Sequence, residues 1–261
     1  MRPVIDQGRS IDWSATSGDY AAFRPGPPDA LFDRLQALGI GLPGQRILDL
    51  GTGTGVMARA FARRGAVAAG IDIAAGQIEA ARRLAESEAL AIDFRVAPAE
   101  EPPFAERSFE AATANQCFLY FDRVRLLAAL RRVLVPEGRL AISHFSWLPR
   151  LDPIARASEA LILEFNPAWG GADFDGTIAP MPEGMPDDLV LEGFFWFDAD
   201  VPFDRAGWLG RIRASRGVGA TLSAEQVAAF DRAHAALLER IAPPSFTIKH
   251  RVDARILRFL A

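Results

Sequence analysis

The chain has 261 residues, of which 50% are apolar and 24% charged, a composition typical of a globular protein that buries a sizeable core. Its net charge of −4 excludes an overall positive field that would attract nucleic acid. Its single cysteine excludes an intrachain disulfide and a cysteine metal cluster. Because no apolar run is long enough for a membrane helix or a signal peptide, we expect a cytoplasmic protein without membrane or nucleic-acid partners.

Residues 1–30 are polar and rich in turn-forming residues, and a helix is predicted over 29–38. From residue 46 onward, short apolar runs alternate with amphipathic ones. The apolar runs predict strands at 46–50, 67–73, 91–96, 110–115 and 139–145. The amphipathic runs predict helices at 56–64, 77–88 and 123–134, the last capped by Asp122. This alternation indicates an α/β fold with a parallel sheet covered on both faces.

After residue 147 the alternation breaks. One helix is predicted at 153–164, a strand at 189–197, two helices at 205–215 and 223–241, and a final strand at 246–260. We expect one domain over 1–261, with its core at about 30–148, 189–198 and 245–261. Segments 1–29, 149–188 and 202–244 are longer than sheet connections require, and we expect them to form a cap over the carboxyl edge of the sheet.

The most informative stretch follows the first strand and opens the first helix of the alternating region. It carries Gly51, Gly53 and Gly55 in a G-x-G-x-G pattern, in the context of a nucleotide-binding loop. Asp72 ends the next strand, where a carboxylate can bind ribose hydroxyls; the alternative is that it caps the following helix. Val56 replaces the third glycine of the dinucleotide fingerprint. Asp49 would repel a pyrophosphate but attract an α-ammonium group.

The pattern D-x-G-x-G-x-G closely resembles motif I of the class I S-adenosylmethionine-dependent methyltransferases, small-molecule branch, and the resemblance extends over residues 45–145. It implies a Rossmann-like sheet of seven mostly parallel strands, the last antiparallel, with helices on both faces and a cap formed by insertions. It also implies S-adenosylmethionine as cofactor.

The resemblance further implies a set of cofactor contacts. Asp72 would bind the ribose, and Ile73 and Gln77 would lie on the two faces of adenine. Residues 96–104 resemble a family stretch in which an aspartate commonly contacts adenine; Pro98 stands there, which leaves Ala99 and Glu100 to recognise the base. The remaining expected contacts are Asp49, Gly51, Thr52, Gly53 and Gly55 of the loop, Asn115 and Gln116 at the methionine portion, and Tyr20 and Arg24 in a segment similar to an N-terminal lid. Asn115 and Gln116 have the alternative of satisfying backbone groups at a strand end.

Candidate acceptor contacts come from the segments that follow the fourth and fifth strands. His144 is the candidate general base, with a hydrogen-bonded structural histidine as the alternative. An apolar wall is expected from Phe118, Tyr120 and Phe121. Within the insertions the residues of interest are Glu159, Asn166, Trp169, Arg211 and Arg213. The two arginines cannot share a helix face, so one should point inward, where it could bind a carboxylate or phosphate.

Together these features predict a methyltransferase that moves the methyl group of S-adenosylmethionine to a small molecule by in-line displacement. The alternative is a non-catalytic S-adenosylmethionine-binding or regulatory protein on the same fold. A nucleic-acid methylase is disfavoured, because residues 115–118 do not match the N-P-P-Y pattern of amino methylases of that kind. The sequence does not identify the acceptor, the methylated atom or the oligomeric state.

Overall fold

A computed structural model describes residues 5–8, 11–23, 25–182 and 184–260. Seven strands form one sheet in the order β3-β2-β1-β4-β5-β7-β6. The strands are β1 (Arg46–Leu50), β2 (Val67–Asp72), β3 (Asp93–Val96), β4 (Phe109–Asn115), β5 (Leu134–Trp147), β6 (Leu189–Asp204) and β7 (Ser245–Phe259). Strand β7 runs antiparallel to both of its neighbours, and the other pairs are parallel. The predicted α/β class and mostly parallel seven-stranded sheet are confirmed.

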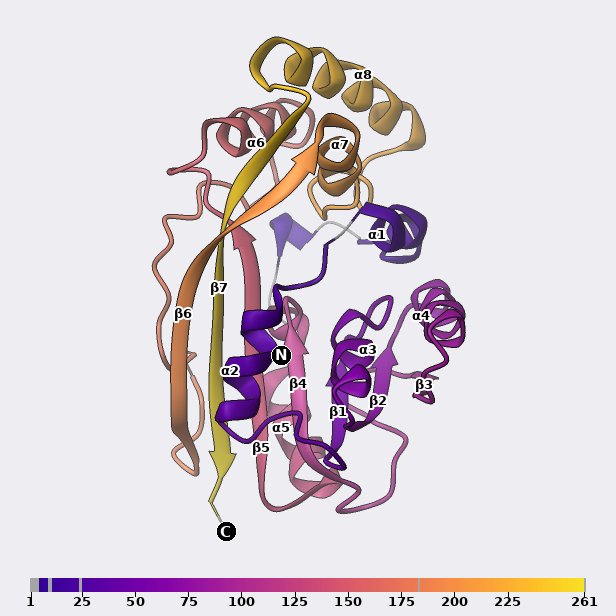
Figure 1. The fold of residues 1–261 in the computed structure, drawn as a ribbon, viewed down its shortest axis with the longest axis vertical. Coiled ribbons are helices and arrows are strands. Elements are labelled where there is room, and N and C mark those ends of the chain that lie inside the picture. The colour runs from indigo at the N-terminus through magenta and orange to yellow at the C-terminus, as the bar shows by residue number, and fades with distance from the viewer. Residues whose placement is uncertain (1–4, 9–10, 24, 183, 261) are drawn as a thin grey trace.

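The helices cover both faces of the sheet (Figure 1). They are α1 (Ser17–Phe23), α2 (Asp29–Ala37), α3 (Val56–Arg63), α4 (Ala75–Ser87), α5 (Arg123–Val133), α6 (Pro153–Phe165), α7 (Arg205–Arg213) and α8 (Ala224–Ile241). Apolar side chains of α2, α3 and α4 belong to the core cluster on one face, and those of α5 belong to the cluster on the other. Among the described residues, no helix combines the length and hydropathy that crossing a membrane requires.

Helices α6, α7 and α8 form the cap, at the end of the molecule toward which the parallel strands run (Figure 1). Strands β6 and β7 have 16 and 15 residues and continue beyond the short parallel strands to carry these helices. The cap shares the core cluster of α2, α3 and α4 through buried residues such as Trp208 and Phe230. Side chains cap its helix starts: Asp152 caps α6, Asp204 caps α7 and Ser223 caps α8. The Asp152 carboxylate accepts from the N–H groups of Ile154 and Ala155, each at 3.0 Å.

The expected cap segment 149–188 is too long, because its last part does not belong to the cap. Strand β6 runs in the same direction as β5, because both pair antiparallel with β7. After α6 the chain must therefore return along the sheet before β6 can start. Met181 and Met185 on this return segment pack against the core cluster that contains α5, away from the carboxyl edge.

Candidate functional site

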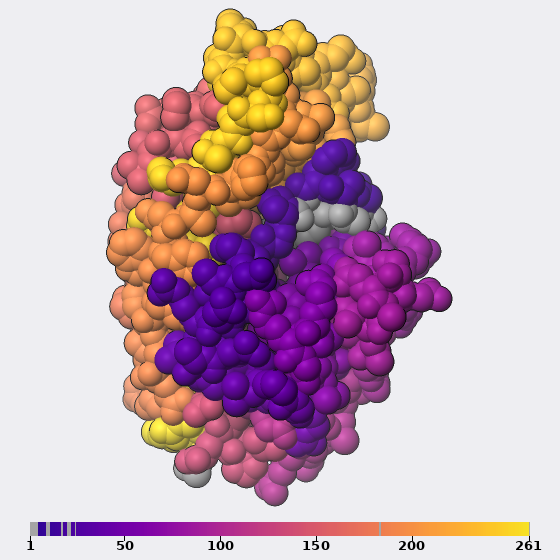
Figure 2. Space-filling model, in the orientation of Figure 1, coloured from indigo at the N-terminus to yellow at the C-terminus, as the bar shows by residue number. Residues whose placement is uncertain are grey.

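A cavity of about 460 Å³ lies at the carboxyl edge of the parallel strands, where α/β sheets place their ligands. Its lining comes from the ends of β1, β2, β4 and β5, the loop after β3, the N-terminal arm, α6 and the segment 211–216. Figure 2 shows the indigo N-terminal residues between the magenta β1–β4 half of the molecule and the orange and yellow cap.

The glycine loop forms the floor of the cavity between β1 and α3. Gly51 and Gly53 line it with φ values of 57° and 55°, in the left-handed region that favours glycine. A Cβ atom on Gly51 would lie 3.0 Å from the Sγ atom of Cys117, so a side chain there would crowd the cavity wall. Gly55 does not line the cavity; its φ is 76°, and a Cβ atom would lie 2.7 Å from the Phe94 ring. Two of the three glycines therefore leave room for a ligand, and the third allows close packing.

Asp72 ends β2 and faces the cavity. Its carboxylate accepts hydrogen bonds from the backbone N–H groups of Gly53 (2.9 Å) and Ala74 (2.8 Å). Burial raises the pKa of this carboxyl. Beside it Ile73 is 58% exposed and gives the cavity an apolar platform. The alternative that Asp72 caps the following helix is wrong: the N-cap of α4 is Ala74, no side chain caps this helix, and Asp72 binds the N–H of Ala74 itself.

Asp49 lies behind the glycine loop and does not line the main cavity. Its carboxylate accepts from the hydroxyls of Thr52 (2.6 Å) and Thr113 (2.7 Å). Burial raises its pKa to about 6. Asp49, Thr52 and Asn115 line a small adjoining cavity of about 20 Å³, which is large enough for one water molecule.

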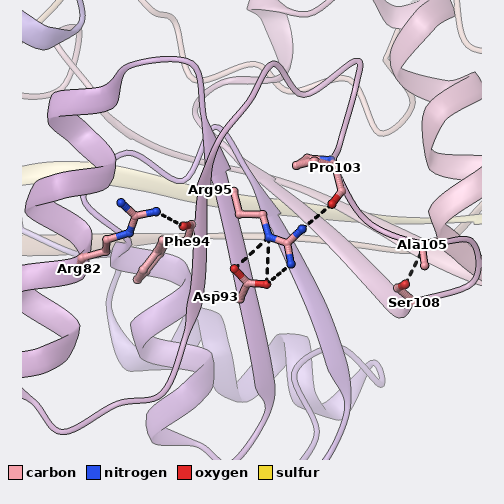
Figure 3. A network of polar contacts seen from close by, with 7 residues as sticks. All are labelled: Arg82, Asp93, Phe94, Arg95, Pro103, Ala105 and Ser108. Carbon is pink, nitrogen blue, oxygen red and sulfur yellow. Dashed lines mark hydrogen bonds and ion pairs between the residues drawn. The ribbon is translucent and has the colours of Figure 1, made fainter.

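The loop after β3 supplies Ala99 and Glu100 to the cavity wall. One oxygen of the Glu100 carboxylate accepts from the N–H of Asp122, the cap of α5 (2.9 Å). Figure 3 shows how Arg95 joins strand to loop: its guanidinium binds Asp93 and donates to the carbonyl of Pro103 (2.5 Å). Within the loop the carbonyl of Pro98 accepts from the N–H of Glu101 (3.0 Å), so the loop is held at both ends and by its own backbone.

Gln77, in the first turn of α4, is 97% buried and lines the cavity. Its amide nitrogen donates to the carbonyl of Trp13 (3.1 Å). Its Oε1 atom has no hydrogen-bond partner among the described residues. A buried acceptor without a donor is costly, which indicates that a ligand supplies one.

Asn115 and Gln116 line the cavity at the end of β4. The Asn115 Oδ1 atom accepts from the Ser143 hydroxyl (3.1 Å), and the Gln116 amide donates to the carbonyl of Phe145. Gln116 has a φ of 64°, unusual for a residue with a side chain and frequent at functional sites. Both side chains therefore satisfy strand-end groups and form part of the wall.

These residues fit the expected cofactor. The carboxylate at the end of β2 suits a ribose, and the exposed isoleucine with the unpaired buried acceptor suits a flat base. The glycine floor leaves room for a compact chain. Nine of the expected contacts line the cavity: Gly51, Gly53, Asp72, Ile73, Gln77, Ala99, Glu100, Asn115 and Gln116. The Tyr20 side chain and Arg24 lie outside the described residues. Within the described chain no cluster of His, Cys, Asp and Glu could hold a metal ion.

His144 does not line the cavity, so the structure does not support it as the base. The next three residues of β5, Phe145, Ser146 and Trp147, line the cavity, whereas His144 lies one position before them. The Nδ1 atom of His144 instead lies 3.1 Å from the Asp253 carboxylate, which also binds Arg255. The geometry is that of the structural alternative.

Trp147 ends β5 and separates two charged groups of the cavity wall. Its indole N–H donates to the Glu159 carboxylate (2.5 Å), and the Arg211 guanidinium carbon lies 4.7 Å from its ring centroid. The second Glu159 oxygen accepts from the N–H of Asp173 (2.8 Å). Burial raises the pKa of Glu159, which is 4% exposed.

Aromatic rings surround these charges. Tyr120, Phe121, Trp169 and Phe174 line the cavity, and Trp13 packs edge-on against Tyr120 at 5.1 Å. The predicted wall after β4 is therefore largely correct. Its exception, Phe118, is buried in the core cluster that contains α5.

The arginines on α7 separate as expected: Arg211 lines the cavity, whereas Arg213 binds Asp19 and Asp231. Asn166 is structural, donating to the carbonyl of Gly217 (3.0 Å). Ser215 and Arg216 also line the cavity and were not predicted. They follow α7 in a segment without a motif, so no sequence signal marked them.

Residues 48–142 match a family model described as a methyltransferase domain. Methyltransferase GfsG of Streptomyces halstedii is 34% identical over 152 residues, covering 57% of this chain and 51% of that protein. The ubiquinone/menaquinone biosynthesis C-methyltransferase UbiE of Vibrio campbellii is 32% identical over 163 residues, 58% of this chain and 62% of that enzyme. The chain thus matches only half to three fifths of the length of these two relatives.

Among solved structures, a candidate type II methyltransferase from Anaeromyxobacter dehalogenans has a TM-score of 0.59. It covers 91% of this chain and 98% of its own, at 22% sequence identity. This similarity shows the fold and leaves the chemistry to the residues of the cavity.

Proposed function

We propose that the protein is a class I S-adenosylmethionine-dependent methyltransferase that transfers the methyl group of S-adenosylmethionine to a small molecule; the match of residues 48–142 to a methyltransferase domain supports this. One observation carries this proposal: a single cavity joins two chemically different halves. The half around Asp72 and Gln77 suits a nucleoside, and the half around Trp147 and Trp169 suits an apolar acceptor.

Within the first half, Asp72 would hold the ribose hydroxyls while its bond to Gly53 fixes the glycine floor. Ile73 would pack against adenine, and the free Oε1 atom of Gln77 would accept a hydrogen bond from the nucleoside. Asn115 and Gln116 would line the methionine portion. Asp49, held by two threonines behind the loop, would attract the α-ammonium through its charge.

Bound there, S-adenosylmethionine supplies a methyl group that is already activated by its sulfonium. The work of the chain is then alignment and exclusion of water, for which effective molarities of ~10⁵ M or more are known. The aromatic side chains line the second half of the cavity, where an acceptor would be placed beside the methyl group.

An acceptor hydroxyl or amine must also lose a proton. Glu159 is the carboxyl of the second half that could accept it, because its oxygens keep lone pairs beyond their bonds to Trp147 and Asp173. We assign the base role to Glu159 in place of His144.

The alternative of a non-catalytic S-adenosylmethionine-binding protein is disfavoured, since the curated relatives are named as enzymes. We further propose that the protein works in the cytoplasm without nucleic acid, in keeping with its net charge of −4.

Calorimetric titration of the purified protein with S-adenosylmethionine, S-adenosylhomocysteine and NAD⁺ tests the cofactor. We expect micromolar binding of the two sulfur nucleosides and none of NAD⁺. Release of S-adenosylhomocysteine in the presence of candidate acceptors then tests transfer. Binding of NAD⁺ instead, or of no nucleotide by a folded sample, would contradict the proposal.

A further inference from the structure

Two neighbouring side chains in the acceptor half of the cavity carry polar atoms that the protein leaves unused. Ser215 is 8% exposed, and its hydroxyl has no hydrogen-bond partner among the described residues. The same holds for the Nη1 atom of Arg216, whose Nε atom lies 3.0 Å from the Asp6 carboxylate. Both residues line the cavity.

Unused buried donors of this kind indicate a ligand. A hydroxyl or guanidinium N–H removed from water without a partner costs free energy, so native proteins rarely keep one without a reason. A guanidinium N–H beside a hydroxyl is a donor pair suited to an oxyanion, and such charge-assisted bonds are about twice as strong as neutral ones.

The charges of this half favour a singly charged anion over a dianion. Its lining carries the guanidinium groups of Arg211 and Arg216 and the carboxylate of Glu159, and Asp6 pairs with Arg216 from outside the lining. Because these four charges already balance, a carboxylate adds one buried negative charge, held by the unused donors, whereas a phosphate dianion would add two. The flat rings of Trp147 and Trp169 favour an aromatic body behind the anionic group.

We propose that the methyl acceptor is a small aromatic carboxylic acid whose carboxylate is bound by the Ser215 hydroxyl and the Arg216 Nη1 group. This assignment rests on the proposed methyltransferase function, because it takes the aromatic half of the cavity as the acceptor half. The carboxylate fixes the acid at the cap end and leaves its nucleophilic substituent free to point toward the cofactor half.

Benzoate and its neutral counterpart benzamide are the probes. Each is titrated calorimetrically into the full-length protein, with and without saturating S-adenosylhomocysteine. We expect benzoate to bind and benzamide to bind at least about tenfold more weakly, the loss that accompanies one missing hydrogen bond to a charged group. Equal affinity for the two probes, or no benzoate binding up to its solubility limit, would overturn the proposal.

Ser215→Ala is the most direct variant. The hydroxyl makes no hydrogen bond within the described residues, so its removal should leave the thermal midpoint unchanged and weaken benzoate about tenfold. Unchanged benzoate affinity in this variant would count against the site.

Arg216→Gln should weaken benzoate more strongly, and Asp6→Asn is its matched control. Both variants break the Asp6–Arg216 ion pair, but Asp6→Asn keeps the guanidinium, so it should bind benzoate at least as tightly as the wild type. An equal loss in both variants would show that ordering of the N-terminal arm is responsible and would refute the carboxylate site.

The nucleotide titrations separate this proposal from the one on which it rests. Binding of S-adenosylhomocysteine without binding of benzoate refutes the acceptor class alone. Binding of benzoate by a protein that rejects both sulfur nucleosides refutes the methyltransferase function and leaves the carboxylate site standing.

Discussion

The carboxylate of Asp72 accepts a 2.9 Å hydrogen bond from the backbone N–H of Gly53, and this bond joins the end of β2 to the turn that follows β1. The two residues are 19 positions apart in the chain. A single side chain therefore faces the nucleoside half of the cavity and sets the shape of its floor.

Replacement of Asp72 by alanine should weaken S-adenosylmethionine binding about tenfold to a hundredfold, because the variant loses both the ribose acceptor and the bond to Gly53. Isothermal titration calorimetry measures the change. Glu110→Ala, on strand β4 and outside the cavity, is the control and should bind like the wild type. Equal losses in the two variants would show that sheet damage, rather than ligand contact, is responsible.

Asp49 should make the protein less stable as the pH rises. Its pKa is about 6 in the folded state against 3.8 for the model carboxyl, so the folded state binds the proton more tightly. Its stabilisation is fully present below pH 3.8 and is lost as the pH rises through 6, a change of about 3 kcal/mol. Urea unfolding of wild type and Asp49→Asn from pH 4 to 7 measures it. A difference between them that does not vary with pH would contradict this assignment.

His234 should act in the opposite direction. Burial lowers its pKa from 6.5 to about 4, so it stays neutral where the unfolded chain is protonated. Its contribution is fully present above pH 6.5 and is lost as the pH falls through 4, again about 3 kcal/mol. The same unfolding series on His234→Gln should show the wild type gaining stability over the variant as the pH rises. A wild-type advantage that shrinks as the pH rises would reverse the predicted sign.

Glu159→Gln should lower kcat about a hundredfold once an acceptor is found, since general-base catalysis contributes about that much or more. It should also remove the acidic limb of the pH–rate profile, which a purely structural role would leave in place. His144→Gln is the control, because His144 does not line the cavity, and should retain most of the wild-type kcat. A large loss in the His144 variant with a small one in the Glu159 variant would restore the histidine as base.

Most of the fold could be predicted because hydrophobic periodicity and glycine signals act locally. The predicted strand 46–50 coincides with β1, and Asp122 caps α5 as expected. Strand β6 was predicted to end at Phe197, yet it continues to Asp204 through pairing with β7. Such pairing depends on a distant segment, so a local pattern could not define its end. The single-domain assignment remains a prediction.

The nucleoside half of the site was predictable because a motif fixes the order of its residues along β1, β2 and β4. The acceptor half was less so. His144 was chosen for its chemistry, whereas the three residues that follow it in β5, Phe145 to Trp147, line the cavity. Ser215 and Arg216 reach it only through the packing of α7 against the N-terminal arm, and neither spacing nor residue type indicates that in advance. The individual ligand contacts stay predictions.

Strand β7 lies between β5 and β6 but follows both of them in the chain, and this order bears on synthesis. As the chain leaves the ribosome, β6 emerges with the aromatic run Phe194–Phe197 before its sheet partner exists. The sheet stays interrupted beside β5 until residues 245–259 arrive. The nascent protein therefore passes through a stage with an unpaired, apolar strand edge, the feature that chaperones recognise and that promotes aggregation.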